Sequence, residues 1–180
     1  TAPGQVTIKV TGELDGQPVA HDEEQVNTYA ASTQAEPDIA VLADGSYVLT
    51  WQSYDQDEDN TYGVYIQRFA ANGTPIGPAV RANTETASTQ ELPRAAALSD
   101  GGYVVVWQDN SGVDGSGWGI VAQRYNAQGV AQGSNVVVNT RTSNTQSRPA
   151  VAGYDGGYAV AWTSTTNTGN NNSNLFTPTS

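Results

Sequence analysis

An internal repeat constrains this chain more than any other feature of its sequence. Residues 32–84 and 88–140 align without a gap at an offset of 56 positions, and a third copy begins near residue 144. Five anchors recur in the first two copies: Gln34 with Gln90, Pro37 with Pro93, Trp51 with Trp107, Arg68 with Arg124, and Asn83 with Asn139. Repetition at this length is typical of stacked supersecondary units. The 180 residues are therefore expected to form a single repeat domain.

Each repeat is expected to contain four β-strands. Short apolar runs bounded by Gly, Asn and Asp favour strands, and helical signals are nearly absent. In the first full copy the strands are expected at residues 38–43, 47–53, 63–69 and 76–82. The second strand is apolar on both faces, which predicts a central place in its sheet and a core role for its tryptophan.

Two further positions have structural interpretations. The prolines of the three copies are expected just before the first strand, where a missing N–H removes no ladder hydrogen bond: Pro37, Pro93 and Pro149. Arg68 and Arg124, in the third strands, are expected to be held between units by backbone carbonyls rather than to act in catalysis.

The ends of the chain contain incomplete units. Residues 5–28 resemble the second half of a repeat, residues 29–84 and 85–140 form two full copies, and residues 141–180 form a partial third. The fold class predicted is all-β, with propeller-like blades that are circularly offset so that the terminal repeat is split. Because propellers have about 4–8 blades, three cannot close a ring within one chain. The expected partner is another copy of the chain, in a ring or filament joined through the half-repeats; a segment of a longer protein is the alternative.

Composition narrows the possible partners and the compartment. Eighteen acidic residues against seven basic ones give a net charge of −11, which disfavours binding to nucleic acid. No apolar run approaches the roughly 20 residues of a membrane helix, so membrane insertion is not expected. The absence of Cys excludes disulfides and thiolate chemistry. A bias toward Thr, Ser, Asn, Gln and Gly, with one Lys, indicates an extracellular or cell-surface protein.

The repeat also resembles a known class of modules. The strings ADGSYVLTWQ, DGSGWGIVAQRYNAQG and VNT are similar to repeats of large secreted bacterial surface proteins of the RTX adhesin type, and the likeness covers about residues 27–162. Residues 100–129 fit best, whereas the first copy replaces the Asp-Gly-Ser-Gly loop with residues 57–60. The resemblance implies an exported, non-catalytic adhesive or scaffold module. The nonapeptide calcium repeats that define RTX segments are absent.

The loop between the second and third strands carries the candidate metal ligands. Asp55, Asp57 and Asp59 alternate in the first copy, as carboxylates do in calcium-binding loops. An EF-hand would need Gly at the sixth position and Glu at the twelfth, where this chain has Asn60 and Ile66. A calcium site and a solvated acidic loop are the two interpretations.

The same loops contain candidate ligand-binding residues. Trp118, Tyr62 and Tyr54 fall outside the strand periodicity, and Asp109 and Asp114 lie nearby. Exposed aromatic rings beside polar side chains are a common arrangement for holding a sugar. The alternative is that Trp118 only covers its loop.

Catalytic signatures are weak in this sequence. The single histidine, His21, lies in the atypical first half-repeat, and no Gly-x-Ser-x-Gly elbow is present. No acidic pair lies on an apolar segment that would raise one pKa. We therefore expect a non-enzymatic structural or adhesive module that assembles by completing its split repeat between chains. A lectin-like module that uses the inter-strand loops is the alternative, and a propeller-type glycosidase is a third hypothesis.

Overall fold

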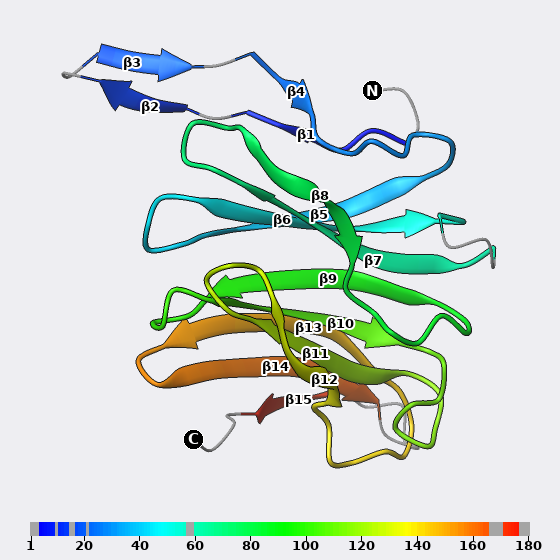
Figure 1. Ribbon diagram of the computed structural model, residues 1–180. Coiled ribbons are helices and arrows are strands. Elements are labelled where there is room, and N and C mark those ends of the chain that lie inside the picture. Colours follow the sequence, from blue (N-terminus) through cyan, green and yellow to red (C-terminus); the bar gives the residue numbers. More distant parts are fainter. Residues whose placement is uncertain are drawn as a thin grey trace.

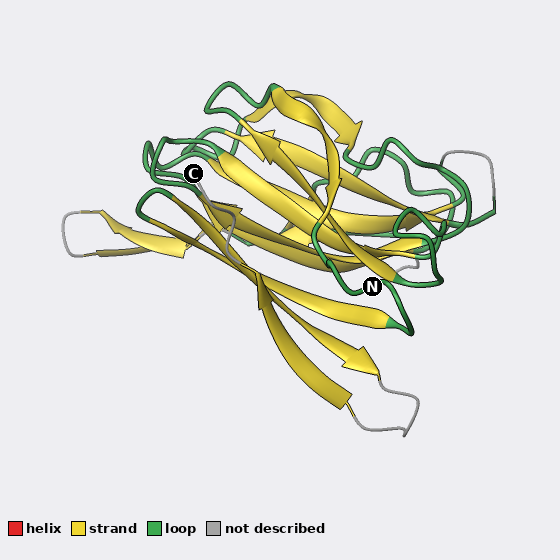
Figure 2. Ribbon diagram, turned by 90° about the horizontal axis from the view of Figure 1, so that it is seen from below, coloured by secondary structure: helices red, strands yellow, loops and turns green. Residues whose placement is uncertain are grey.

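A computed structural model describes residues 4–9, 11–14, 17–20, 22–56, 60–165 and 171–176. These residues form β-strands joined by turns and loops, without helix (Figure 2). No helix long and apolar enough to cross a bilayer is therefore found in this part of the chain. The strands are β1 (Thr7–Ile8), β2 (Thr11–Leu14), β3 (Gln17–Ala20), β4 (Glu24–Gln25), β5 (Gln34–Val41), β6 (Tyr47–Tyr54), β7 (Tyr62–Phe69), β8 (Pro75–Arg81), β9 (Gln90–Ala97), β10 (Tyr103–Asp109), β11 (Gly119–Tyr125), β12 (Ala131–Val137), β13 (Gln146–Tyr154), β14 (Gly157–Thr165) and β15 (Asn171–Phe176).

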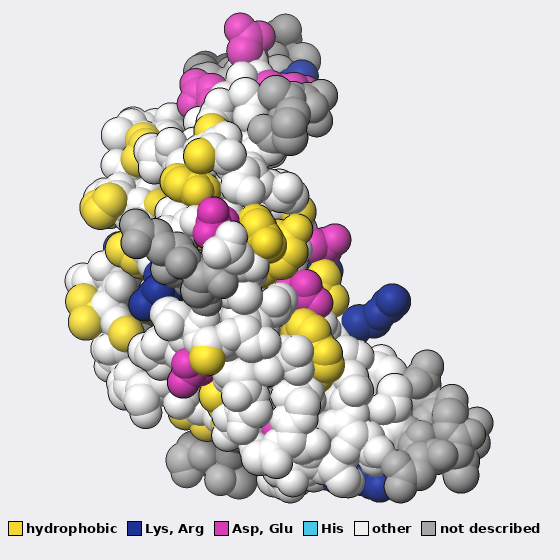
Figure 3. Space-filling view, turned by 90° about the vertical axis from the view of Figure 1, so that its right-hand side faces the viewer, with side chains coloured by type: hydrophobic (Ala, Val, Ile, Leu, Met, Phe, Trp, Pro, Cys, Tyr) yellow, Lys and Arg dark blue, Asp and Glu magenta, His cyan; other side chains and the backbone are white. Residues whose placement is uncertain are grey.

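The strands assemble into antiparallel blades that stack on one another (Figure 1). Strands β5 to β8 form one four-stranded sheet and β9 to β12 form a second, each in sequence order. Strands β13 to β15 form a third sheet, while β1 pairs with β4 and β2 with β3. Viewed from the side, the stack has a crescent outline (Figure 3). The predicted all-β fold of propeller-like, four-stranded units is confirmed, and the proposed repeat boundaries at the two ends stay a prediction.

The second strand of each blade is central and buried, as its two apolar faces indicate. Strand β6 lies between β5 and β7, and β10 lies between β9 and β11. Its tryptophans pack in the core, with Trp51 1%, Trp107 0% and Trp162 8% exposed. Burial of such large rings is the main apolar contribution to each blade interface.

The first strand of each blade begins earlier than expected and contains a bulge. The three prolines lie inside β5, β9 and β13 rather than before them, at positions where the pairing register shifts. Proline is tolerated at a bulge because its nitrogen is not needed by the ladder there. The residue before each proline has a positive φ: Glu36 (52°), Leu92 (53°) and Arg148 (55°). The predicted start of this strand was therefore wrong: β5 begins at Gln34, whereas the sequence predicted a start at residue 38.

Successive blades are joined by a buried pair of amide side chains. Asn83 accepts a hydrogen bond from Val64 N at 2.9 Å, and its Nδ2 donates to Glu85 O and to Gln90 Oε1 at 2.7 and 3.0 Å. Both Asn83 and Gln90 are at most 2% exposed. The same Asn–Gln bond occurs from Asn27 to Gln34 and from Asn139 to Gln146. The recurring Asn-Thr and Thr-Gln strings thus encode the link from one blade to the next.

Replacing Asn83 with Ala is expected to lower the free energy of unfolding by about 2–4 kcal/mol, since it leaves Val64 N and Gln90 Oε1 buried without partners. Urea titration monitored by tryptophan fluorescence measures this loss. The control is Asn72→Ala, which removes an exposed turn bond to Thr74 N. Equal losses in the two variants would contradict the linking role.

Arg68 holds two blades together, as its sequence position suggested. Its Nη1 donates to Gln128 O at 2.6 Å and its Nη2 to Ala127 O at 2.7 Å, both in the hairpin of the next blade. Arg124 instead forms an ion pair with Asp100 at 2.6 Å in its own blade. The expectation of an arginine held between units is thus confirmed for Arg68 and wrong for Arg124.

Candidate functional site

The first strands of the three blades lie next to one another and create a shared pocket. Strand β9 contacts both β5 and β13, so equivalent residues of the three strands face a common space. A pocket of about 350 Å³ opens where these strands begin, and its lining includes Glu36, Leu92, Arg94 and Arg148. Three of these are the positive-φ residues of the bulges. Bulges redirect side chains, and backbone strain concentrates at functional sites, so this pocket is the leading candidate.

Buried glutamines hold the strained backbone in place. Leu92 N donates to Gln52 Oε1 and Arg148 N to Gln108 Oε1, each at 2.9 Å. Both glutamines are 6% exposed and come from the central strand of the preceding blade. Each bulge is therefore fixed by its neighbour, which positions the pocket residues relative to one another.

Two carboxylates of the first strands differ in environment: Glu36 lines this pocket, and Glu91 comes directly before the lining residue Leu92. Burial raises the pKa of the half-buried Glu91, and the nearby charge of Glu36 raises it further, while a hydrogen bond from Gln108 Nε2 at 2.8 Å opposes these effects. Glu36 is exposed and pairs with Arg94 at 3.4 Å. The two carboxyls belong to different repeats, so a search for an acidic pair on one apolar segment of the sequence could not find them. A carboxyl with a raised pKa near a second carboxyl is the arrangement used for paired acid–base chemistry.

The aromatic residues singled out in the sequence lie at the same end of the blades: Tyr54 ends β6, Tyr62 begins β7, and Trp118 lies in a loop. Tyr54 and Tyr62 are half-buried and contact each other edge to face, with ring centroids 5.1 Å apart. Trp118 is also half-buried, and its carbonyl accepts a hydrogen bond from Gln146 N at 3.0 Å. These rings do not line the pocket between β5, β9 and β13.

The predicted aspartates Asp55, Asp109 and Asp114 all accept hydrogen bonds from the protein itself. Asp109 is 1% exposed and accepts from Ser111 N at 2.8 Å. Asp114 accepts from Ser116 N and from Asn139 Nδ2, at 2.9 and 2.8 Å. Asp55 accepts from Asn60 N at 3.1 Å. The described residues contain no group of three or more His, Cys, Asp or Glu that could hold a metal, and Asp57 and Asp59 lie outside them.

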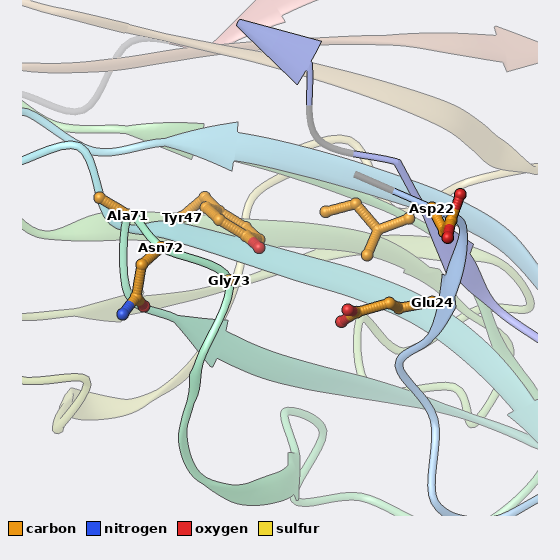
Figure 4. Close-up of a pocket in the computed structure, with 7 residues that line it drawn as sticks. Asp22, Glu24, Tyr47, Ala71, Asn72 and Gly73 are labelled. Atoms are coloured by element: carbon orange, nitrogen blue, oxygen red, sulfur yellow. The ribbon is translucent and has the colours of Figure 1, made fainter. Parts of the chain in front are cut away.

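A smaller pocket lies where the N-terminal strands meet the first blade. It is about 40 Å³ in volume and is lined by Asp22, Glu24, Tyr47 and the turn at Asn72 and Gly73. The carboxylate of Glu24 points toward this turn, whereas that of Asp22 points away (Figure 4). The space is that of about one water molecule, too small for an organic ligand.

Sequence analysis overlooked the residues that distinguish the pocket. In the repeated frame Thr-Gln-x-x-Pro, the two variable positions are Ala35-Glu36 in the first copy, Glu91-Leu92 in the second and Ser147-Arg148 in the third. Charged residues at the variable positions of an otherwise constant frame were the available signal. The sequence did not show that the bulges place Glu36, Leu92 and Arg148 around one pocket, and without this knowledge the signal could not be interpreted.

Comparison with known proteins gives information on the fold. No protein-family model matches the chain, and no curated protein is significantly similar to it. Two solved structures match over 98% of the chain: an endo-arabinase from Bacteroides thetaiotaomicron (TM-score 0.53, 13% identity) and a GH43 endo-arabinanase from Bacillus licheniformis (TM-score 0.54, 14% identity). The fold is β-propeller-like. The chain spans 72% and 65% of the lengths of these two proteins.

The functional expectation drawn from the sequence is corrected by this comparison. A non-enzymatic adhesive or filament-forming module, with a lectin-like module as the alternative, was expected, yet the matching solved structures are of enzymes. The adhesin, RTX, filament and calcium assignments likewise find no support in these neighbours. The error has a physical origin: the repeated residues encode blades, which catalytic and non-catalytic propellers share, whereas function depends on the few positions that differ between blades.

Proposed function

We propose that this protein cleaves glycosidic bonds of a polysaccharide, in the pocket where β5, β9 and β13 begin. The observation that carries the proposal is that half-buried Glu91 of β9, whose pKa burial raises, is near enough to Glu36 of the adjacent strand β5 to interact with its charge. The fold shared with two endo-arabinanases supports a carbohydrate substrate, and arabinan is the first polymer to test. A polymer substrate also agrees with the extracellular location expected from composition.

The two carboxyl groups have different roles in the proposed reaction. Glu91 donates its proton to the glycosidic oxygen as the bond from that oxygen to the anomeric carbon breaks. Glu36 in its charged form accepts a proton from the water that attacks the anomeric carbon. Arg94 holds Glu36 in position, and Gln108 holds Glu91. One C–O bond breaks, one forms, and the proton passes from Glu91 to the leaving hydroxyl group.

Release of reducing ends from a panel of polysaccharides, with arabinan included, tests the proposal. We expect cleavage of at least one polymer, with activity that declines on the alkaline side when Glu91 loses its proton. Because the pKa of Glu91 is raised, this decline is expected at a higher pH than an ordinary glutamate would give. Binding of a polymer without release of reducing ends at any pH would contradict the proposed hydrolysis.

A further inference from the structure

A second pocket lies between the first and second blades, at the end opposite to Glu91. It has a volume of about 280 Å³, and Arg68 and Tyr103 contribute its polar lining. Tyr103 begins β10, whereas Gln108, the partner of Glu91, lies five residues along the same strand, roughly 17 Å away. The two pockets are therefore separate sites.

Two buried polar atoms of this pocket have no hydrogen-bond partner among the residues that the structure describes. These are the hydroxyl of Tyr103, a side chain that is 0% exposed, and Nε of Arg68. Burial raises the pKa of Tyr103 to about 12, so its hydroxyl keeps its proton and remains a donor at neutral pH. Buried donors without acceptors are uncommon in native structures and call for an explanation. A ligand with acceptor oxygens would satisfy both donors.

In the described part of the chain Arg68 has no carboxylate within ion-pair distance, although Asp44 is near enough to interact with its charge. In the second blade the equivalent Arg124 pairs with Asp100. The residue that corresponds to Asp100 in the first blade is Asp44, which is fully exposed and accepts hydrogen bonds from Ser46 N and Oγ instead. Arg68 uses its two terminal nitrogens on the neutral carbonyls of residues 127 and 128. Its positive charge is thus available to an anionic group.

One wall of the pocket is apolar, whereas Gln128 and Gly129 of the next blade's hairpin form another part of the lining. Ile66 forms part of the buried core, while Ile76 and Val80 of β8 are 41% and 45% exposed. An added Cβ at Gly77, which lies between them with a φ of 73°, would meet no atom within 4 Å, so the rim is open there. A ligand with an apolar body would cover these exposed side chains.

We propose that this pocket binds a small organic carboxylate. Its carboxylate oxygens accept hydrogen bonds from the Tyr103 hydroxyl and from Arg68 Nε, and its hydrocarbon part packs against Ile66, Ile76 and Val80. The site is independent of the proposed hydrolytic pocket, and the proposal does not depend on that activity.

Calorimetric titration with benzoate, with the neutral isostere benzamide as the comparison probe, tests this inference. We expect saturable binding of benzoate at a single site and benzamide binding weaker by about tenfold, because only the carboxylate makes charge-assisted bonds to Arg68. Equal affinities for the two probes, or no saturation with benzoate, would overturn the proposal.

A pair of variants separates ligand binding from structural effects. Tyr103→Phe is expected to weaken benzoate binding by about tenfold without lowering the melting temperature, since the hydroxyl has no partner in the described ranges of the chain. The matched control is Tyr125→Phe, because Tyr125 stacks on Tyr103 at 4.8 Å but does not line the pocket. Unchanged benzoate affinity in Tyr103→Phe would contradict the inference, as would a crystal structure grown with benzoate that shows only water at Tyr103 and Arg68.

Discussion

Replacement of Glu91 with Gln is expected to reduce polysaccharide cleavage by about 10²–10⁴-fold, which is the usual contribution of a general acid. The substituted amide cannot donate the proton that the leaving oxygen requires. Its Oε1 still accepts the hydrogen bond from Gln108 Nε2, so β9 keeps its local structure. Initial rates of reducing-end release, measured across the pH range, provide the test.

The folded state of the Glu91→Gln variant is expected to be intact. A carboxyl whose pKa is raised in the folded protein binds its proton more tightly there than in the unfolded chain. Stability therefore falls as the pH rises from the ordinary glutamate pKa toward the raised one, and the neutral amide removes this dependence. We expect a melting temperature at neutral pH equal to or above that of the parent protein.

A second carboxylate variant provides the matched control. Glu24→Gln changes an exposed glutamate of β4 that does not line the pocket between β5, β9 and β13. It should leave the rate of cleavage unchanged. If Glu24→Gln and Glu91→Gln lose activity equally, or if Glu91→Gln retains full activity, Glu91 is not the acid.

Trp107→Ala is expected to lower the free energy of unfolding by about 3–5 kcal/mol, the usual cost of truncating a large buried side chain. Trp107 is 0% exposed, and it packs in the cluster that joins the first two blades, with Val64, Ile66 and Val105. The cavity would therefore weaken a blade-to-blade interface as well as one sheet. Since domains are stable by only about 5–15 kcal/mol, the variant is expected to be close to unfolding.

Chemical denaturation in urea, with Trp118→Ala as the control, measures this effect. Trp118 is half-buried in a loop, so its truncation should cost clearly less than that of Trp107. The two residues also differ in their predicted roles: the sequence predicted a core position for Trp107, whereas it gave Trp118 as a candidate for sugar binding. A loss in Trp107→Ala no larger than in Trp118→Ala would contradict the assignment of Trp107 to the interface.

Much of the fold follows from the sequence alone, because local patterns encode strands and turns. The apolar faces around Trp51 and Trp107 predicted the central strands, and the Gly, Asn and Asp residues that bound the apolar runs predicted where strands end. The starts of the first strands were misplaced, because the bulge before each proline breaks the two-residue period on which the prediction relied.

The sequence by itself determined that this protein is an array of antiparallel four-stranded blades, since the period of 56 residues, the turn residues and the apolar alternation are all local properties. Only the tertiary structure decided which charged residues meet. Glu36 and Glu91 are 55 positions apart, yet the stacking of β5 on β9 brings their charges together and buries one of them. Likewise, Arg68 and Tyr103 share a pocket only because two blades pack face to face. Contacts between blades depend on how the sheets stack. The repeated residues specify each blade by itself, so they do not predict which residues of the next blade the variable positions will contact.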